Sequence, residues 1–143
     1  MTATPANIDF DDVFKIASSG MRAQGARLRV IAENIANAHS TGSTPGAEPY
    51  RRREVIFKDM VDRASGVEMV KVASVQPDMS PFTKEFNPTH PAADKDGYVL
   101  TPNVKPLIET MDMREAQRSY DANLGVIDTI RNMIARALDI LRG

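Results

Sequence analysis

Residues 10–38 read FDDVFKIASSGMRAQGARLRVIAENIANA, and apolar side chains recur through this stretch at alternating steps of three and four residues. The series consists of Phe10, Phe14, Ala17, Met21, Leu28, Ile31, Ile35 and Ala38, with Gln24 as its interruption. Such steps place an apolar residue about every 3.5 positions, which is the spacing of a narrow coiled-coil seam along one side of an α-helix. The stretch therefore predicts one long helix that needs a partner along its length.

The other end of the chain repeats this spacing between residues 113 and 141. The second series consists of Met113, Ala116, Tyr120, Ile127, Ile130, Ile134, Ala137 and Leu141, with Asn123 as its interruption. In one small chain, the nearest partner for each long helix is the other helix. We therefore expect the two ends of the chain to pair as an antiparallel stalk.

The helix ends are marked by capping signals. Asp9 is the expected N-cap of the first helix, followed by further acidic residues in the first turn, where the helix dipole favours anions. This helix is expected to end near Ala38. Asn103 is the expected N-cap of the second helix, with Pro106 in the first turn, where its missing N–H has no intrahelical partner to lose. The second helix should reach Leu141.

The middle of the chain cannot be a continuous helix, because eight of the nine prolines lie between Pro45 and Pro106. Short runs with partly alternating apolar residues predict strands instead. These runs are 54–58, 67–75 and 98–101. Phe82 and Phe86 are expected to anchor an irregular segment between prolines.

The predicted fold class is mainly α with a small β or extended middle. The long terminal helices form an antiparallel coiled-coil stalk, and the middle is a Pro-rich, β-containing insert that lies outside this stalk. Residues 1–9 form a leader that is expected to be flexible. Residues 10–38 and 103–143 form the helical domain, and residues 39–102 form the loop and β-rich region.

Composition excludes several classes of function. The net charge of −1 gives no basic excess for nucleic acid. The chain has no Cys, and no apolar run approaches the roughly 20 residues that a transmembrane helix needs. Its first residues lack the basic start and apolar core of a cleavable signal peptide. The single basic cluster, 51–53, is interpreted as solvated surface.

No group of residues predicts catalysis, a cofactor site or a metal site. His39 and His90 lie in different loops without a histidine or cysteine at ligand spacing. The run Asp94-Lys95-Asp96-Gly97 resembles the start of a calcium loop but lacks the final glutamate, so a turn leading into the strand at Tyr98 is expected. We therefore expect no catalytic, cofactor-binding or metal-binding residues.

The informative residues are those of the helix seams, which predict helix pairing and a subunit interface. The predicted set is Phe14, Met21, Gln24, Leu28, Ile31, Asn34, Ile35, Asn37, Tyr120, Asn123, Ile127, Ile130, Ile134, Leu138 and Leu141. Buried polar members such as Gln24, Asn34, Asn37 and Asn123 would fix the register at some cost in stability. The apolar surface is wider than one seam, so another subunit is expected to cover the remainder.

Two segments resemble the bacterial flagellar axial proteins, the family of rod and hook subunits. The first runs from Ser18-Ser19-Gly20-Met21-Arg22-Ala23-Gln24 to Ile31-Ala32-Glu33-Asn34-Ile35-Ala36-Asn37-Ala38 and precedes Thr41-Gly42. The second includes Arg118-Ser119-Tyr120-Asp121-Ala122-Asn123. In the family a Tyr usually follows the Thr-Gly at once, whereas here Tyr50 comes after the insertion 43–49. This departure resembles the proximal-rod branch, as do His90-Pro91, Gly97-Tyr98-Val99 and Pro102-Asn103-Val104.

The resemblance implies a structural subunit that polymerises through its terminal helices into the helical tube of the basal-body rod. It further implies torque transmission, a place across the periplasm, and a share in the wall of the export channel. The implied partners are other rod subunits, further copies of the chain, the basal-body adaptor protein and the flagellar type III export apparatus, which accepts subunits without a cleavable signal. Two alternatives remain open at this point: a small coiled-coil adaptor that does not polymerise, and a hydrolase of cell-wall glycan.

Overall fold

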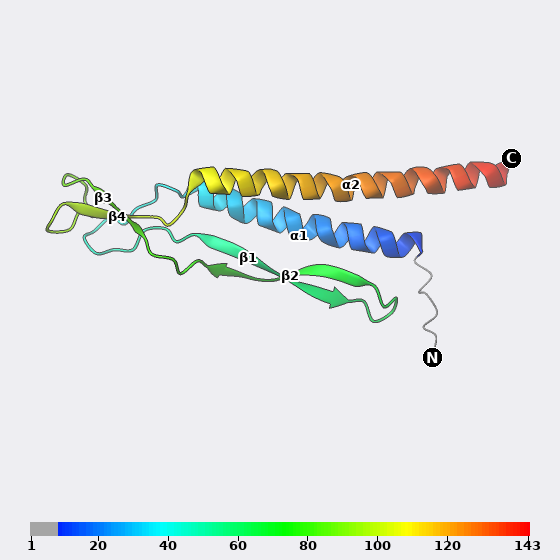
Figure 1. The fold of residues 1–143 in the computed structure, drawn as a ribbon, viewed down its shortest axis with the longest axis horizontal. Helices are drawn as coiled ribbons and strands as arrows, with labels where there is room; N and C mark the ends of the chain where they lie inside the picture. The colour runs from blue at the N-terminus through cyan, green and yellow to red at the C-terminus, as the bar shows by residue number, and fades with distance from the viewer. Residues whose placement is uncertain (1–8) are drawn as a thin grey trace.

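The computed structural model describes residues 9–143, which form an elongated molecule with two long helices and two β-hairpins (Figure 1). The elements in chain order are α1 (Phe10–Ala36), β1 (Arg53–Val61), β2 (Glu68–Pro77), β3 (Thr83–Phe86), β4 (Tyr98–Thr101) and α2 (Pro106–Arg142). The predicted class, mainly α with a small β middle, is confirmed. The expected flexible leader lies outside the described residues up to position 8. Neither helix described combines the length and hydrophobicity that a bilayer-spanning segment needs.

Helix α1 begins as predicted at Asp9. Asp9 and Asp12 form a capping box. The Asp9 side chain accepts a hydrogen bond from the Asp12 N–H, and the Asp12 side chain accepts one from the Asp9 N–H. These bonds satisfy N–H groups that the first helical turn otherwise leaves without partners. The helix ends at Ala36 with Asn37 as its C-cap, two residues earlier than the apolar series suggested.

Helix α2 begins differently from the prediction. Its N-cap is Lys105, which makes no side-chain capping bond, while Pro106 occupies the first turn as expected. The prediction of Asn103 as N-cap was therefore wrong. The Asn103 carboxamide instead accepts from the Arg52 N–H at 2.7 Å and donates to the Asp78 and Ser80 carbonyls. The sequence prediction considered only a bond from this side chain to the adjacent helix. In the folded chain the side chain instead bonds to residues distant in sequence.

Strands β1 and β2 form an antiparallel hairpin in which Arg53 lies opposite Pro77 and Val61 opposite Glu68. A register shift between Ile56 and Phe57 interrupts the pairing. Both strands were predicted, and both extend further than the apolar runs that indicated them. A bulge of this kind increases the local twist of a two-stranded ribbon, which helps the ribbon to follow a helix.

Strands β3 and β4 form a second, smaller hairpin at one end of the molecule. β3 occupies the segment expected to be irregular, so that prediction was wrong; every residue of this short strand is exposed and no burial pattern marks it. Phe86 lies opposite Tyr98, with ring centroids 5.3 Å apart in an edge-to-face arrangement. The turn before Tyr98 is confirmed: the Asp94 carboxylate accepts from the Asp96 and Tyr98 N–H groups.

Helix α1 lies between the other two long elements. Figure 1 shows α2 along one side of α1 and the β1–β2 hairpin along another. The hairpin is tied down by the Val70 N–H, which donates to the Ser19 hydroxyl at 3.3 Å. The expectation that the whole insert lies outside the stalk was therefore wrong for this hairpin. The hairpin covers part of the α1 surface that was expected to be covered by another subunit.

The core runs along these contacts as a narrow strip. Its buried side chains are small or branched, which lets three elements approach closely. The buried apolar residues on the helices are Ala17, Ala23, Val30, Ile31, Ala116, Ile127 and Ile130.

Candidate functional site: an assembly surface and its polar anchor

The helices run antiparallel, and three contacts define their register. Gly20 lies against Asn123 so closely that a Cβ on Gly20 would be 2.7 Å from the Asn123 Nδ2 atom. Arg27 makes an ion pair with Glu115 at 3.4 Å, and further along α1 Asn34 meets Glu109 of α2. At the opposite end, the first residue of α1 lines a groove together with Met133 of α2. The part of α2 that follows Met133 therefore extends past the start of α1, as Figure 1 shows.

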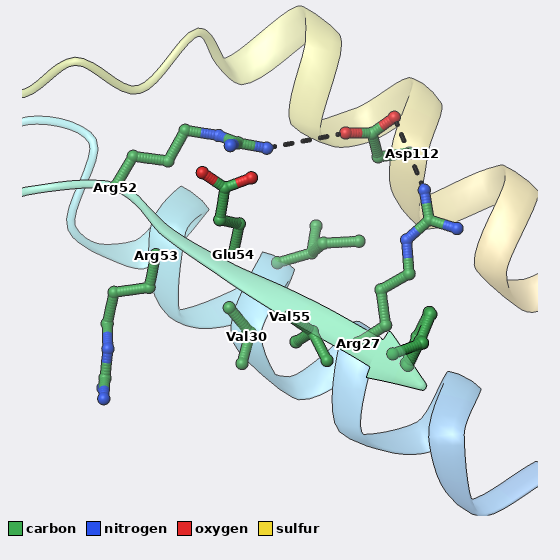
Figure 2. Close-up of a pocket in the computed structure, with 9 residues that line it drawn as sticks. Arg27, Val30, Arg52, Arg53, Glu54, Val55 and Asp112 are labelled. Atoms are coloured by element: carbon green, nitrogen blue, oxygen red, sulfur yellow. Dashed lines mark ion pairs between the residues drawn. The ribbon is translucent and has the colours of Figure 1, made fainter. Parts of the chain in front are cut away.

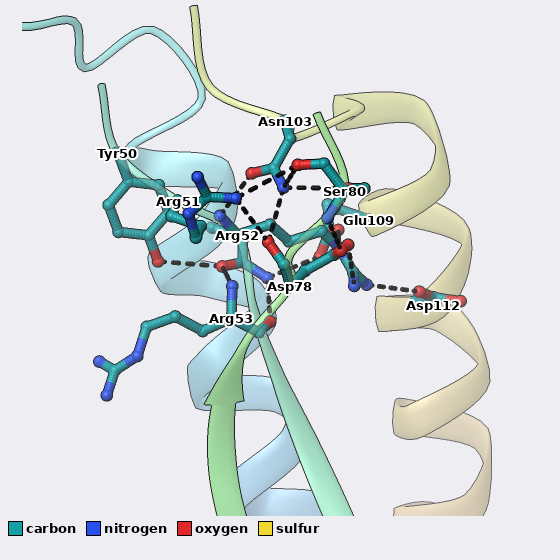
Figure 3. Close-up of polar contacts among 10 residues, drawn as sticks. Tyr50, Arg51, Arg52, Arg53, Asp78, Ser80, Asn103, Glu109 and Asp112 are labelled. Carbon is teal, nitrogen blue, oxygen red and sulfur yellow. Dashed lines mark hydrogen bonds and ion pairs between the residues drawn. The ribbon is translucent and has the colours of Figure 1, made fainter. Parts of the chain in front are cut away.

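Asn34 is the centre of a polar anchor that we call the hairpin-root cluster (Figure 3). The cluster consists of Asn34, Tyr50, Arg51, Arg52, Arg53, Asp78, Ser80, Asn103, Glu109 and Asp112. The Asn34 carboxamide oxygen accepts from the Tyr50 hydroxyl and the Arg53 N–H, while its NH₂ group donates to the Arg53 carbonyl and to Glu109. All four hydrogen-bonding positions of this amide are therefore used.

The two bonds to Arg53 explain how α1 holds the hairpin. Across the hairpin, the Asp78 N–H donates to the Arg52 carbonyl at 2.8 Å. In an antiparallel pair the next residue, Arg53, points its backbone groups towards the outer edge. Asn34 meets both groups there, at 3.0 Å and 2.8 Å, and so takes the place of a neighbouring strand. The helix thereby covers an edge that would otherwise be open to pairing with another chain.

Charged side chains complete the cluster. The Arg52 guanidinium makes ion pairs with Glu109, Asp78 and Asp112. Burial disfavours the charge on Arg52, but the hydrogen bond and charge of Glu109, with the charge of Asp78, raise the pKa of Arg52. Hydrogen bonds from the Ser80 N–H and hydroxyl, and the Arg52 charge, lower the pKa of Asp78. Arg52 and Asp78 therefore carry opposite charges at neutral pH, and charge-assisted bonds from Arg52 join the segment before β1 to the segment after β2 and to α2.

Arg51 extends the cluster towards the second hairpin. Its guanidinium lies 4.0 Å from the centroid of the Phe82 ring, and it donates to the Asp78 and Ser80 carbonyls. The interpretation of residues 51–53 as solvated surface was therefore wrong for Arg51 and Arg52. Only Arg53 fits it, with an exposed side chain that pairs with Glu33 at 3.5 Å.

A cavity of about 310 Å³ adjoins the cluster between α1, β1 and α2. Figure 2 shows Arg27 and Arg52 reaching Asp112 from two sides, with Val30 and Val55 beneath them. Both arginines pair with the Asp112 carboxylate, so their charges are already paired. The valine side chains form part of the apolar side of the cavity. Among residues 9–143, no three His, Asp or Glu side chains gather closely enough to hold a metal ion. The arrangement joins α1, α2 and the start of the β1–β2 hairpin.

Two open grooves follow the helix pair. One, of about 570 Å³, we call the Phe10 groove. It is lined by Phe10, Val13, Ala122, Gly125, Val126, Thr129, Ile130 and Met133. The other has a volume of about 430 Å³. It is lined by Ser18, Met21, Arg22, Gly25, Tyr120 and Ile127. Both grooves are mainly apolar and open to solvent, which is typical of surfaces that bind other proteins.

The structure places the predicted interface residues in three groups. The buried members are Ile31, Asn34, Ile127 and Ile130. The half-buried members are Met21, Gln24, Leu28, Ile35, Asn37, Tyr120 and Asn123. The exposed members are Phe14, Ile134, Leu138 and Leu141. The predicted seam therefore includes both contacts within the chain and surface that the chain leaves exposed.

The predicted register-fixing residues behave differently from one another. Asn34 bonds across elements, whereas the carboxamides of Asn37 and Asn123 donate to carbonyls one turn back in their own helices. Gln24 has a buried side-chain oxygen without a hydrogen-bond partner in the described part of the chain. Such a group lowers stability.

Sequence reasoning missed two residues of the cluster: Glu109, which accepts from Asn34, and Arg52, which pairs with Glu109. One signal was present: Glu109 lies seven residues before Ala116, so it occupies the α1-facing stripe of α2. A carboxylate in an otherwise apolar stripe requires a buried partner, and the nearby arginines could supply one. Which arginine does so depends on the path of the loop after α1, and sequence spacing does not encode that path.

Comparison with known proteins identifies this architecture. Residues 14–46 match the family model for flagella basal body rod protein, and residues 95–140 match that for the flagellar basal body rod FlgEFG protein C-terminal region. A flagellar basal-body rod protein FlgC from Agrobacterium fabrum is 55% identical over 128 residues, covering 90% of this chain and 92% of that protein. The chain belongs to the FlgC family of flagellar basal-body rod proteins.

More distant FlgC proteins align over the same share of the chain. The FlgC of Borreliella burgdorferi is 40% identical over 146 residues, and that of Salmonella typhimurium is 40% identical over 131 residues. Each alignment covers 90% of this chain and at least 95% of the relative. The resemblance to axial proteins is therefore confirmed, and membership of the FlgC family makes the chain a structural subunit of the basal-body rod and not an enzyme. Its partners are other flagellar components.

Proposed function

We propose that this chain polymerises through α1 and α2 into a tube that transmits torque and forms part of the export-channel wall. In this proposal the helices pair as an antiparallel coiled coil, and neighbouring stalks pack side by side. The neighbours are further copies, other rod subunits and the basal-body adaptor protein. The chain reaches its place across the periplasm through the type III export apparatus.

The observation that carries this proposal is the apolar surface left exposed on the helix pair. From Arg131 to the end of α2 every residue is exposed, although Ile134, Leu138 and Leu141 continue the α1-facing stripe. Phe10 and Phe14 are exposed at the start of α1. Apolar stripes of this length are stable in water only when another surface covers them.

The hairpin-root cluster supports the mechanical part of the proposal. It joins α1, α2 and the β1–β2 hairpin by buried and charge-assisted bonds, so that these elements move as one body. Force applied to one element is then passed to the others, because close-packed interfaces resist sliding. The hairpin along α1 leaves the grooves of the helix pair open for neighbouring subunits.

Replacement of Ile134 by Asp tests this proposal. The side chain is exposed in the single chain, so the substitution should leave folding intact while it places a charge in the subunit interface. Asn132→Asp, on another face of the same helical turn, is the matched control. Sedimentation with rod partners should show long assemblies for the control and small complexes for Ile134→Asp. A wild-type chain that stops at one small defined complex would favour the adaptor alternative instead.

A further inference from the structure

The end of α2 and the Phe10 groove are complementary surfaces. We name residues Ile134–Arg142 the α2 overhang, and we infer that the overhang of one copy packs into the Phe10 groove of a second copy. This inference rests on the proposed self-assembly and specifies the surfaces that meet.

The overhang is a helix with an apolar stripe and no partner among the described residues of its own chain. Leu138 is 52% exposed and Leu141 is 83% exposed, and with Ile134 they lie at steps of four and three residues. These steps extend the stripe formed by Ile127 and Ile130, which are buried against α1. The overhang thus continues an established helix interface beyond the point where α1 ends, over about 13 Å at 1.5 Å per residue.

The Phe10 groove has the shape that such a helix requires. The residues along its α2 wall include Ala122, Gly125 and Thr129, which are small and recur at steps of three and four. Small residues at these steps allow a second helix to approach closely. Larger apolar side chains, Phe10 and Met133, stand on opposite walls, and each is more than 40% exposed. A row of Leu and Ile side chains from a second helix would cover both the Phe10 and the Met133 side chains.

The charges beside the two surfaces are also complementary. The groove opens next to the first turn of α1, where Asp9, Asp11 and Asp12 cluster. On the overhang itself, Arg136 and Arg142 outnumber Asp139. Opposite charges at the rim of an apolar contact favour the correct partner and raise the association rate.

The geometry excludes closure of this contact within one chain. The groove and the overhang lie on consecutive stretches of one continuous helix, and a straight helix cannot fold back on itself. Each copy offers one groove and one overhang, and the proposed polymerisation requires that the two copies use them heterologously, so that the contact can be repeated from copy to copy. A heterologous contact that does not close generates an open helical array.

The test compares Leu138→Asp with Ile140→Asp in the full chain. Two residues along a helix correspond to about 200° of rotation, so these exposed residues lie on opposite faces of the same overhang. We expect Leu138→Asp to weaken self-association in analytical ultracentrifugation by at least about tenfold, because a buried leucine contact is lost. Ile140→Asp should change it much less. Equal losses for both variants would overturn the inference.

Cysteine cross-linking identifies the contact directly, because the natural chain has no cysteine. Copies with Leu138→Cys are mixed with tagged copies that carry either Val126→Cys in the groove or Leu107→Cys at the far end of α2. We expect mixed cross-linked dimers with Val126→Cys only. Assemblies that form without this cross-link would overturn the inference and leave the proposed polymerisation intact. A wild-type chain that stays monomeric at every concentration and with rod partners would overturn both.

Discussion

Asn34 of α1 and Glu109 of α2 meet at 3.1 Å, and each side chain is only 1% exposed. Both are completely buried although both are polar. The pair fixes the register of two helices that lie at opposite ends of the chain, and through Arg52 and Arg53 it also fixes the position of the β1–β2 hairpin.

Replacement of Asn34 by Leu tests this role. The substitution removes four hydrogen bonds and leaves the Arg53 backbone groups and a Glu109 oxygen buried without partners. We expect a loss of about 3 kcal/mol in the free energy of unfolding, measured by urea denaturation. Asn37→Ala is the control, because the Asn37 carboxamide bonds only to nearby groups, and it should cost less than about 1 kcal/mol. Equal effects would contradict a central role for Asn34.

Gly20 and Gly25 should respond in opposite directions to alanine. A Cβ at Gly20 would approach Asn123 to 2.7 Å, whereas a Cβ at Gly25 meets nothing within 4 Å. We expect Gly25→Ala to stabilise the protein by up to about 1 kcal/mol through helix propensity. We expect Gly20→Ala to destabilise it, because the new Cβ displaces the Asn123 carboxamide from its hydrogen bond to the Ser119 carbonyl. Thermal unfolding measures both. Adding Asn123→Ala to Gly20→Ala should restore stability, and failure to do so would show that the clash lies elsewhere.

Gln24→Met should stabilise the folded chain. The Gln24 side-chain oxygen is buried without a partner in the described residues, and Met has a similar length without a strongly polar atom. The expected gain is about 1 kcal/mol in urea unfolding. A loss of stability would instead show that this oxygen is hydrogen-bonded in solution, for example by water.

The lowered pKa of Asp78 predicts a pH dependence. A carboxylate whose folded pKa lies below its unfolded pKa stabilises the protein fully above the unfolded value of about 3.9. That contribution is lost as the pH falls from there through the folded pKa. Wild-type protein should therefore be more stable than Asp78→Asn at pH 7, and the difference should shrink below about pH 4. A difference that stays constant between pH 7 and strongly acidic pH would contradict this assignment.

Amide hydrogen exchange should distinguish the two parts of α2. In a dilute monomer, residues around Ala116 and Ile127, which are buried against α1, should be protected, and the overhang should exchange rapidly. Isolated helical segments of this length are marginal in water without a packing partner. Assembly should then slow exchange in the overhang. Strong protection of the overhang in a verified monomer would show that the chain itself covers it.

The helices could be predicted because their signals are local. The heptad spacing, the Asp9 cap and Pro106 predict the ends of α1 and α2 to within two residues. The position of the β1–β2 hairpin could not be predicted, because it depends on long-range bonds such as that between Ser19 and Val70. Asn103 shows the same limit. Its sequence neighbours favour a helix cap, and only the folded chain brings Arg52, Asp78 and Ser80 to it.

The hairpin-root cluster lies at the end of the helix pair where α2 begins, and the overhang lies at the other end (Figure 1). The helix pair is thus bonded to the β1–β2 hairpin at one end, and α2 projects alone at the other. A beam held in this way deflects most at its tip. In the proposed assembly we therefore expect the overhang to adjust to neighbours at slightly different positions, while the end held by the hairpin-root cluster keeps its shape.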